Sequence, residues 1–202
     1  MIVLWFYESI VVIFNVKHGV ILMEKFTLKL EGQHFKRQYL LYIIEITHGN
    51  DKHYYVGQTG DHNYTTARPA FRRLAGHLED LGGSTQNQIY RYIAEIVLEF
   101  SEAGQKNSKF DEKIKQAVED FLVDSTITMH IYPLQPFSPG IEKDRHLEIV
   151  RKVSLFEKIV INLFRTNRKS IANKKLTLPK KGAECPYPQI FAEIIADFML
   201  NN

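Results

Sequence analysis

The stretch YLLYIIEITHGNDKHYYVGQT, residues 39–59, contains the pattern that decides the fold. Its two halves, 39–47 and 53–59, are rich in the β-branched and aromatic residues that favour strands. The intervening HGND contains residues that are common in turns. Together these features predict a β-hairpin.

Helical periodicity begins after the hairpin. Residues 60–68 form a polar loop, and Pro69 suits the first turn of a helix that the glycine pair at 82–83 ends. Apolar residues recur at helical spacing in four later segments, which are 86–100, 111–123, 141–165 and the segment around 191–199. Residues 126–134 alternate as a strand does. The pattern predicts an α+β domain, in which a small antiparallel sheet of about three strands is flanked by helices, with a helical pair inserted at about 86–123.

Composition sets the broad class. The chain has 202 residues, of which 45% are apolar, and this suits a single domain with one core. A formal net charge of +3 permits a polyanionic partner without requiring one. The lone Cys185 excludes an internal disulfide and a multi-cysteine zinc site, and it fits a reducing compartment. We therefore expect a cytoplasmic protein.

The first 22 residues form an N-terminal extension of uncertain status. Their apolar runs suggest a membrane anchor, but Glu8 interrupts them, no basic region precedes them, and they are shorter than the roughly 20 residues that span a bilayer. No membrane association is expected. The segment is either the product of a start site placed too far upstream or a genuine extra strand, and we assign the single domain to residues 23–202.

Two tyrosines and the helix after the hairpin supply the first candidate site residues. Tyr42 lies in the first predicted strand and Tyr55 in the second, so both can face one pocket, although strand tyrosines usually serve in packing. Arg73 and His77 are four residues apart and therefore share a helix face. The alternative is a solvated face on which His77 lies near Asp80.

Glu157 is unusual for a helical carboxylate. Its neighbours one turn away on either side are Val153, Ser154, Val160 and Ile161. Its own helix therefore offers no ion-pair partner, whereas Glu148 has Arg151 and Lys152 at pairing offsets. A carboxylate on an apolar face is costly unless a cation meets it. The pattern predicts that Glu157 meets a metal ion or an arginine from elsewhere in the fold.

The ordered set of LLYII at 40–44, YVG at 55–57 and FRRLAGH at 71–77 resembles the GIY-YIG nuclease family. That family combines a first motif ending in tyrosine, a Tyr-Ile-Gly motif and a helix with Arg-x-x-x-His. The residues that match are Tyr42, Tyr55, Gly57, Arg73 and His77. The resemblance covers roughly residues 39–175.

This chain departs from the family pattern at three points. The first motif lacks its glycine, and Gln58 stands where some branches carry a lysine. The loop between Gly57 and Arg73 is longer than in compact members, which leaves Arg68 or Arg72 as substitutes for the helix arginine.

The resemblance also implies a metal site. The family carries a metal-binding glutamate on a later helix and an asparagine beyond it, and Glu157 in LFEKIVINLF and Asn173 in IANKK match these positions. By this resemblance Glu157 would hold Mg²⁺ or another divalent cation. Arg73 would stabilise charge on the phosphoryl oxygens, and Tyr42 would be the general base, directly or by relay to His77. Tyr55 would orient the water or the phosphate, and the two tyrosines can exchange roles.

Basic residues are concentrated after the predicted metal-binding helix. They are Arg165, Arg168, Lys169, Lys174, Lys175, Lys180 and Lys181. Such a run is often only a solvated face. Beside a site that cleaves phosphodiesters, it is typical of a surface that neutralises the DNA backbone.

The sequence therefore predicts a metal-dependent endonuclease that hydrolyses double-stranded DNA, and the absence of a recognisable separate DNA-binding domain favours a self-contained restriction-type enzyme. One alternative is a catalytically inactive nucleic-acid-binding module that keeps the same fold. Another is a protein-interaction domain whose tyrosines belong to the core. The oligomeric state stays open, with a homodimer among the options.

Overall fold

The computed structural model describes residues 14–16, 19–21, 27–78, 88–100, 112–173, 179–180 and 182–200. They belong to two units, divided between Glu31 and Gly32. In the first unit, the strands β1 (Phe14–Val16) and β2 (Gly19–Ile21) pair antiparallel. The second unit starts at Gly32, whereas the sequence places the start of the domain at residue 23.

The second unit is organised around a four-stranded mixed sheet. The predicted hairpin is present as β3 (Gln38–His48) and β4 (Asp51–Gln58), which are joined at Gly49 with φ of +57°. Strand β5 (Ser125–Pro136) pairs antiparallel with the other edge of β3. The two-residue strand β6 (Ser170–Ile171) pairs parallel to β4, and the strand order is β5-β3-β4-β6. The sheet thus has four strands rather than about three, and it is mixed rather than antiparallel.

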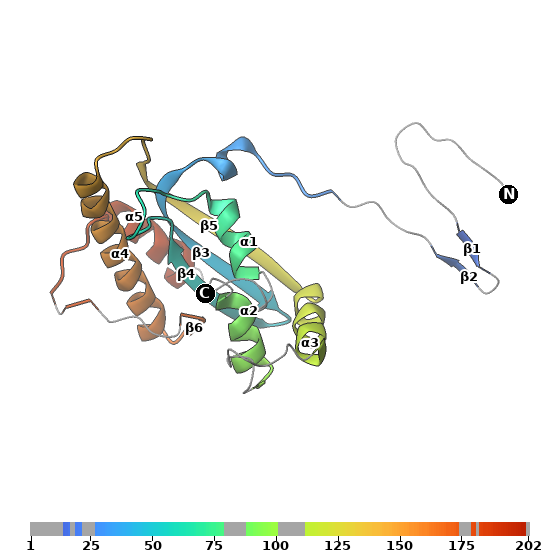
Figure 1. The fold of residues 1–202 in the computed structure, drawn as a ribbon. Helices are drawn as coiled ribbons and strands as arrows, with labels where there is room; N and C mark the ends of the chain where they lie inside the picture. Colours follow the sequence, from blue (N-terminus) through green and yellow to red (C-terminus); the bar gives the residue numbers. More distant parts are fainter. Residues whose placement is uncertain are drawn as a thin grey trace. The chain divides into compact units, whose positions relative to one another are not determined.

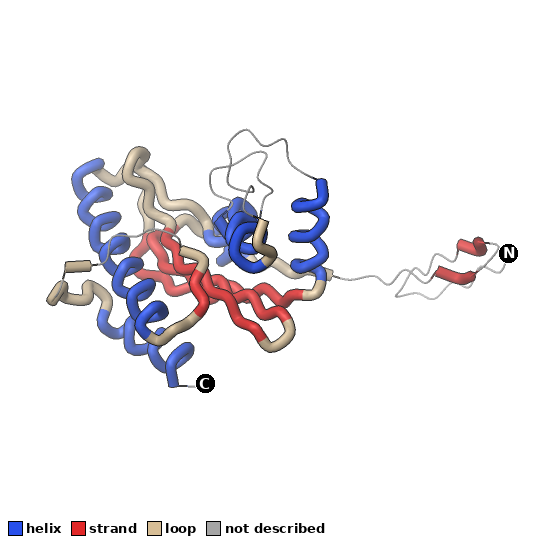
Figure 2. The backbone as a smooth tube through the Cα atoms, turned by 90° about the horizontal axis from the view of Figure 1, so that it is seen from below, coloured by secondary structure: helices blue, strands red, loops and turns tan. Residues whose placement is uncertain are grey.

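Helices cover both faces of this sheet (Figures 1 and 2). The short helix η1 (Gly32–Phe35) contacts α1 (Ala70–Leu78), which packs on one face together with α2 (Gln88–Tyr92), the π-helical turn η2 (Ile93–Val97) and α3 (Glu112–Val123). The other face is covered by α4 (Lys143–Thr166), α5 (Pro188–Ile195) and the π-helical turn η3 (Ala196–Leu200). The α+β class predicted from the sequence is confirmed.

The structure differs from the sequence prediction in the segment at 86–100. The segment at 86–100 is a short α-helix followed by a π-helical turn, in which the Leu98 N–H donates to the Ile93 carbonyl, five residues back. The residue after this bond, Glu99, has a φ of +59° and ends the helix. The predicted end of α1 at the glycine pair lies outside the described residues.

The core explains why residues 40–44 are continuously apolar. Leu40, Tyr42 and Ile44 pack under α1 to α3, whereas Leu41 and Ile43 pack against α4 and α5. A strand covered on both faces needs apolar residues at every position instead of at alternate ones. None of the helices in the described ranges has the combination of length and apolar character that crossing a membrane requires.

Candidate active site

The register of the hairpin fixes the positions of the two candidate tyrosines. Tyr42 lies opposite Gly57 and Ile44 lies opposite Tyr55, so both tyrosines project from the same face of the sheet. Their ring centroids are 6.2 Å apart. A Cβ atom on Gly57 would collide with the Tyr42 ring and its hydroxyl. The glycine of the YVG motif therefore provides the space that the Tyr42 side chain occupies.

Helix α1 adds a histidine and an arginine to this pair. The Nε2 atom of His77 is 2.7 Å from the Tyr42 hydroxyl oxygen, and the Arg73 Nε–H donates to the same oxygen at 3.1 Å. The His77 ring also packs against Tyr55, with a centroid distance of 4.3 Å. Tyr42, Tyr55 and His77 are buried, whereas Arg73 stays partly exposed. The structure thus brings together four of the residues singled out from the sequence.

Burial dominates the electrostatics of the two phenols. It raises the pKa of Tyr42 to about 12, although the Arg73 guanidinium opposes this shift by its charge and its hydrogen bond. Burial also raises the pKa of Tyr55 well above its usual value. The negative charge of Glu157 raises the pKa of both groups further. Neither phenol would ionise at neutral pH without a group that takes its proton.

Glu157 acts on this cluster from the neighbouring helix α4. Because β6 pairs only with His53 and Tyr54, the edge of β4 beyond Tyr54 has no neighbouring strand among the described residues. The α4 helix packs along that edge, and from there the Glu157 charge reaches Tyr42, Tyr55 and Arg73. A carboxylate on one side of the sheet thus acts on residues of the other side.

The Glu157 carboxyl lies in an unusual environment for a helical glutamate. Burial raises its pKa to about 7, against the opposing charges of Arg73 and then Lys158. Within the described residues no hydrogen bond or ion pair reaches this carboxylate. Glu148, on the same helix, has ion-pair partners and a lowered pKa instead. It is paired with Arg145 at 2.5 Å and with the predicted partner Lys152 at 2.8 Å, and these two cations lower the pKa of its carboxyl.

Asn173 lies beside the same strand edge. Its Oδ1 accepts from the Val56 N–H at 2.9 Å, and its Nδ2 donates to the Val56 carbonyl at 2.7 Å. The buried carboxamide thus continues the pairing of β6 by one more residue, and it holds the backbone between Tyr55 and Gly57. In this geometry the Asn173 carboxamide holds the backbone of β4 next to Tyr55, and the catalytic role that the resemblance implies for Asn173 stays a prediction.

The basic residues after α4 are only partly within the described ranges. Lys174, Lys175 and Lys181 lie outside them. Arg165 donates to the Asn173 carbonyl at 2.7 Å, so its guanidinium helps to fix the segment that carries Asn173. Arg168, Lys169 and Lys180 are at least partly exposed. Arg168 and Lys169 precede β6, whose pairing with His53 places them about 13 Å along β4 from Gly57.

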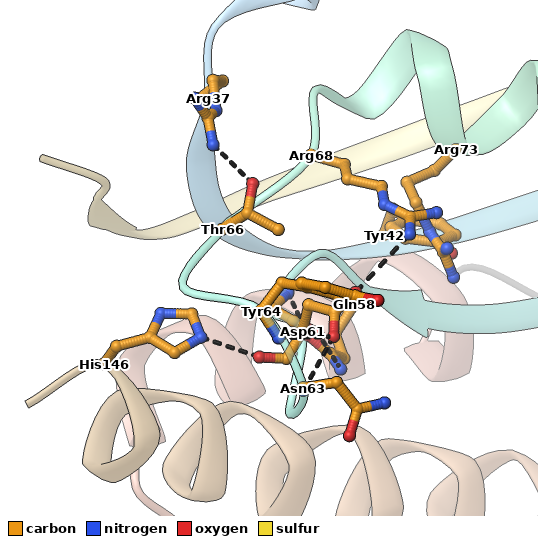
Figure 3. A network of polar contacts seen from close by, with 11 residues as sticks. Arg37, Tyr42, Gln58, Asp61, Asn63, Tyr64, Thr66, Arg68, Arg73 and His146 are labelled. Atoms are coloured by element: carbon orange, nitrogen blue, oxygen red, sulfur yellow. Dashed lines mark hydrogen bonds and ion pairs between the residues drawn. The ribbon is translucent and has the colours of Figure 1, made fainter. Parts of the chain in front are cut away.

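One polar network near the site had no counterpart in the sequence interpretation (Figure 3). It involves the loop between β4 and α1. The buried His146 contacts the Tyr39 hydroxyl through Nδ1 and the Asp61 carbonyl through Nε2, both at 2.7 Å. The Asp61 carboxylate pairs with Arg68 at 3.5 Å. The spacing of Asp61 and Asn63 indicates an Asx turn, but no pattern in the sequence predicts the contact with His146.

Among the described residues, no group of three or more His, Cys, Asp or Glu side chains is placed to hold a metal ion. Comparisons with models of known protein families, with curated proteins and with solved structures found no match.

Proposed function

We propose that this chain is a metal-dependent endonuclease of the GIY-YIG type that hydrolyses phosphodiester bonds in double-stranded DNA. The observation that carries the proposal is the contact of Tyr42 with both His77 and Arg73, together with the charge of Glu157 acting on the same cluster. A core tyrosine in a purely structural role would need one hydrogen-bond partner. It would not need an arginine and a carboxylate as well.

The Glu157 carboxylate fits the role of a metal ligand. It is an oxygen donor without a hydrogen-bonding or ion-pairing partner in the described part of the chain, and burial, which raises its pKa to about 7, disfavours its charged form unless a cation is nearby. A bound Mg²⁺ would supply Lewis-acid stabilisation of the phosphate and the leaving oxygen. With a single protein carboxylate, the remaining ligands would be water and phosphate oxygens, as is common for Mg²⁺.

Arg73 and Glu157 are the partly exposed members of the cluster, so the phosphate would approach on their side. The Arg73 guanidinium has further N–H donors besides the Nε–H that bonds Tyr42, and its planar fork suits phosphate oxygens. In this position it would stabilise the negative charge that builds up on the phosphoryl group during attack.

The tyrosine and the histidine would remove the proton from the attacking water. When a proton moves from water to the Tyr42 oxygen, the phenolic proton can pass to His77 Nε2, which is 2.7 Å away. This coupled transfer avoids an isolated phenolate, which a pKa of about 12 makes unfavourable. Tyr55, which packs on His77, would orient the water or the phosphate.

A catalytically inactive DNA-binding module is the second candidate, because exposed basic residues would serve either function. The two are separated by incubating plasmid DNA with the purified protein and Mg²⁺, and by mapping the ends of any products. We expect the parent protein to cleave the plasmid. Arg73→Lys should lower the cleavage rate by at least 100-fold, because lysine keeps the charge but lacks the planar guanidinium with its paired N–H donors. Retention of DNA by a protein that yields no products would favour the inactive module.

A further inference from the structure

The loop that joins β4 to α1, residues 59–68, is closed on itself. Gly60 and Ala67 form an antiparallel bridge, and the Arg68 N–H donates to the Thr59 carbonyl at 3.2 Å. Inside the loop, one carboxylate oxygen of Asp61 accepts the backbone N–H groups of residues 63 and 64, at 2.9 Å and 3.2 Å. The turn therefore has a defined conformation rather than an open one.

Contacts with two other parts of the chain hold the loop in place. On the β3 side, Arg37 donates to the Ala67 carbonyl at 3.3 Å and also contacts the Thr66 hydroxyl. On the α4 side, His146 contacts the Asp61 carbonyl at 2.7 Å, and His62 Nε2 lies 3.2 Å from the Ser154 hydroxyl. Figure 3 shows the contact of Arg37 with Thr66 and the contact of His146 with Asp61.

The tip of this supported loop carries an exposed aromatic side chain. Tyr64 is 70% exposed, whereas the other tyrosines in the described ranges are buried or partly buried. The neighbouring residues His62, Asn63 and Thr65 are exposed as well. Tyrosine is one of the residue types that contribute most to binding energy at interfaces.

The loop lies between the two helices that supply the proposed site. Ser154, which His62 contacts, is one helical turn before Glu157 on α4. At its other end the loop continues through Arg68 into α1, which carries Arg73. Its first arm follows Gln58, the last residue of β4, which comes directly after Gly57. A ligand bound between Arg73 and Glu157 would therefore lie within reach of the loop tip.

We infer that Tyr64 contacts a nucleobase of the bound DNA next to the scissile phosphate, by stacking on it or by wedging into a base step. The inference rests on the proposed function, which makes DNA the ligand of this site. A phenol ring offers a flat apolar face to any base, and the polar neighbours at the tip can reach base edges or the backbone. Because the loop is already ordered, little conformational entropy is lost on contact.

The direct test places a fluorescent reporter at the loop tip. Trp5 is the single tryptophan of the chain, so Tyr64→Trp in a Trp5→Phe background gives one emitting residue. Val123→Trp in the same background is the matched control, since Val123 is 82% exposed and lies at the His48 end of the sheet. Both proteins are titrated with a fluorescein-labelled 30-base-pair DNA duplex in Ca²⁺, with anisotropy recording binding independently.

We expect DNA to quench the emission at position 64 by at least half, and to leave the emission at position 123 nearly unchanged. Binding without quenching at position 64 would overturn the inference while leaving the proposed function intact. If the Trp5→Phe protein itself did not bind DNA, both the inference on Tyr64 and the proposed function would be contradicted.

A second set of variants checks the contact through affinity. Tyr64→Ala should weaken duplex binding roughly 5-fold to 100-fold, the loss expected for one base contact, whereas Tyr64→Phe, which keeps the ring, should bind as the parent does. Equal affinity of Tyr64→Ala and the parent would contradict the inference.

Discussion

The phenolic oxygen of Tyr42 lies 2.7 Å from Nε2 of His77, and both residues are buried. The two belong to strand β3 and helix α1, which are separated in the sequence by β4 and the β4–α1 loop. Arg73 donates to the same oxygen, so one buried hydroxyl joins a group that can accept a proton and a group that can bind phosphate.

Replacing Gly57 tests how the Tyr42 ring is accommodated. Gly57→Ala should lower the free energy of unfolding by about 1–3 kcal/mol, because the new methyl group would overlap the Tyr42 ring. Gly32→Ala is the matched control, since a Cβ there meets nothing within 4 Å. Urea unfolding of the three proteins gives the comparison. A Gly57→Ala protein as stable as the control would mean that Tyr42 does not occupy this space.

Removing the Asn173 carboxamide tests how the β4 edge is held. Asn173→Ala should lower the free energy of unfolding by about 2–4 kcal/mol, because the buried N–H and carbonyl of Val56 both lose a partner. Asn167→Ala is the control, because Asn167 is exposed and makes one bond, to the Leu163 carbonyl. Hydrogen exchange should also become faster at the Val56 amide. Unchanged protection there would exclude the positioning role.

The contacts of Gly57 and Asn173 illustrate which parts of the structure can be predicted from the sequence and which cannot. The hairpin was predictable because its strands and turn are local, and so was the shared face of Arg73 and His77 on one helix. Strand β6 was missed because two residues carry no periodicity, and without it the carboxamide of Asn173 had no visible partner. The bond between His146 and Tyr39 joins residues 107 positions apart, and no local sequence pattern predicts such a contact.

The pH dependence of stability tests the environment of Glu157. Its pKa is raised from 4.5 to about 7 in the folded state, so the folded protein binds more protons than the unfolded chain between these values. Stability should therefore fall as the pH rises through this window and then level off. Glu157→Gln removes the effect, and its advantage over the parent should grow from near zero at pH 4.5 to about 1–3 kcal/mol at pH 8.

A divalent cation should reverse this penalty in the parent. Melting temperatures at pH 8 should rise with added Mg²⁺ in the parent and not in Glu157→Gln, because the ion stabilises the charged carboxylate. A Glu157→Gln protein less stable than the parent at pH 8 without metal would instead indicate a structural ion pair at this position.

The basic segment after α4 should set the salt dependence of DNA binding. Replacing Lys174, Lys175, Lys180 and Lys181 together by glutamine should reduce the slope of log K against log salt by roughly 0.9 for each phosphate contact that is lost. Lys113→Gln with Lys115→Gln on α3 is the control, because it removes two of the four charges at a place outside the segment. An unchanged slope in the fourfold variant would show that the segment does not contact the DNA backbone.

The most direct test of the account measures cleavage and binding on the same preparations of the parent, Glu157→Gln and Glu148→Gln. Both variants lose one carboxylate from α4, but Glu148 is an exposed residue paired with Arg145 and Lys152. Plasmid cleavage is measured in Mg²⁺ and duplex affinity in Ca²⁺. We predict that Glu157→Gln keeps DNA affinity within a few-fold and loses cleavage by at least 100-fold, while Glu148→Gln cleaves as the parent does. Cleavage by Glu157→Gln at the parent rate would contradict the account, because the proposed metal ligand would then have no part in the reaction.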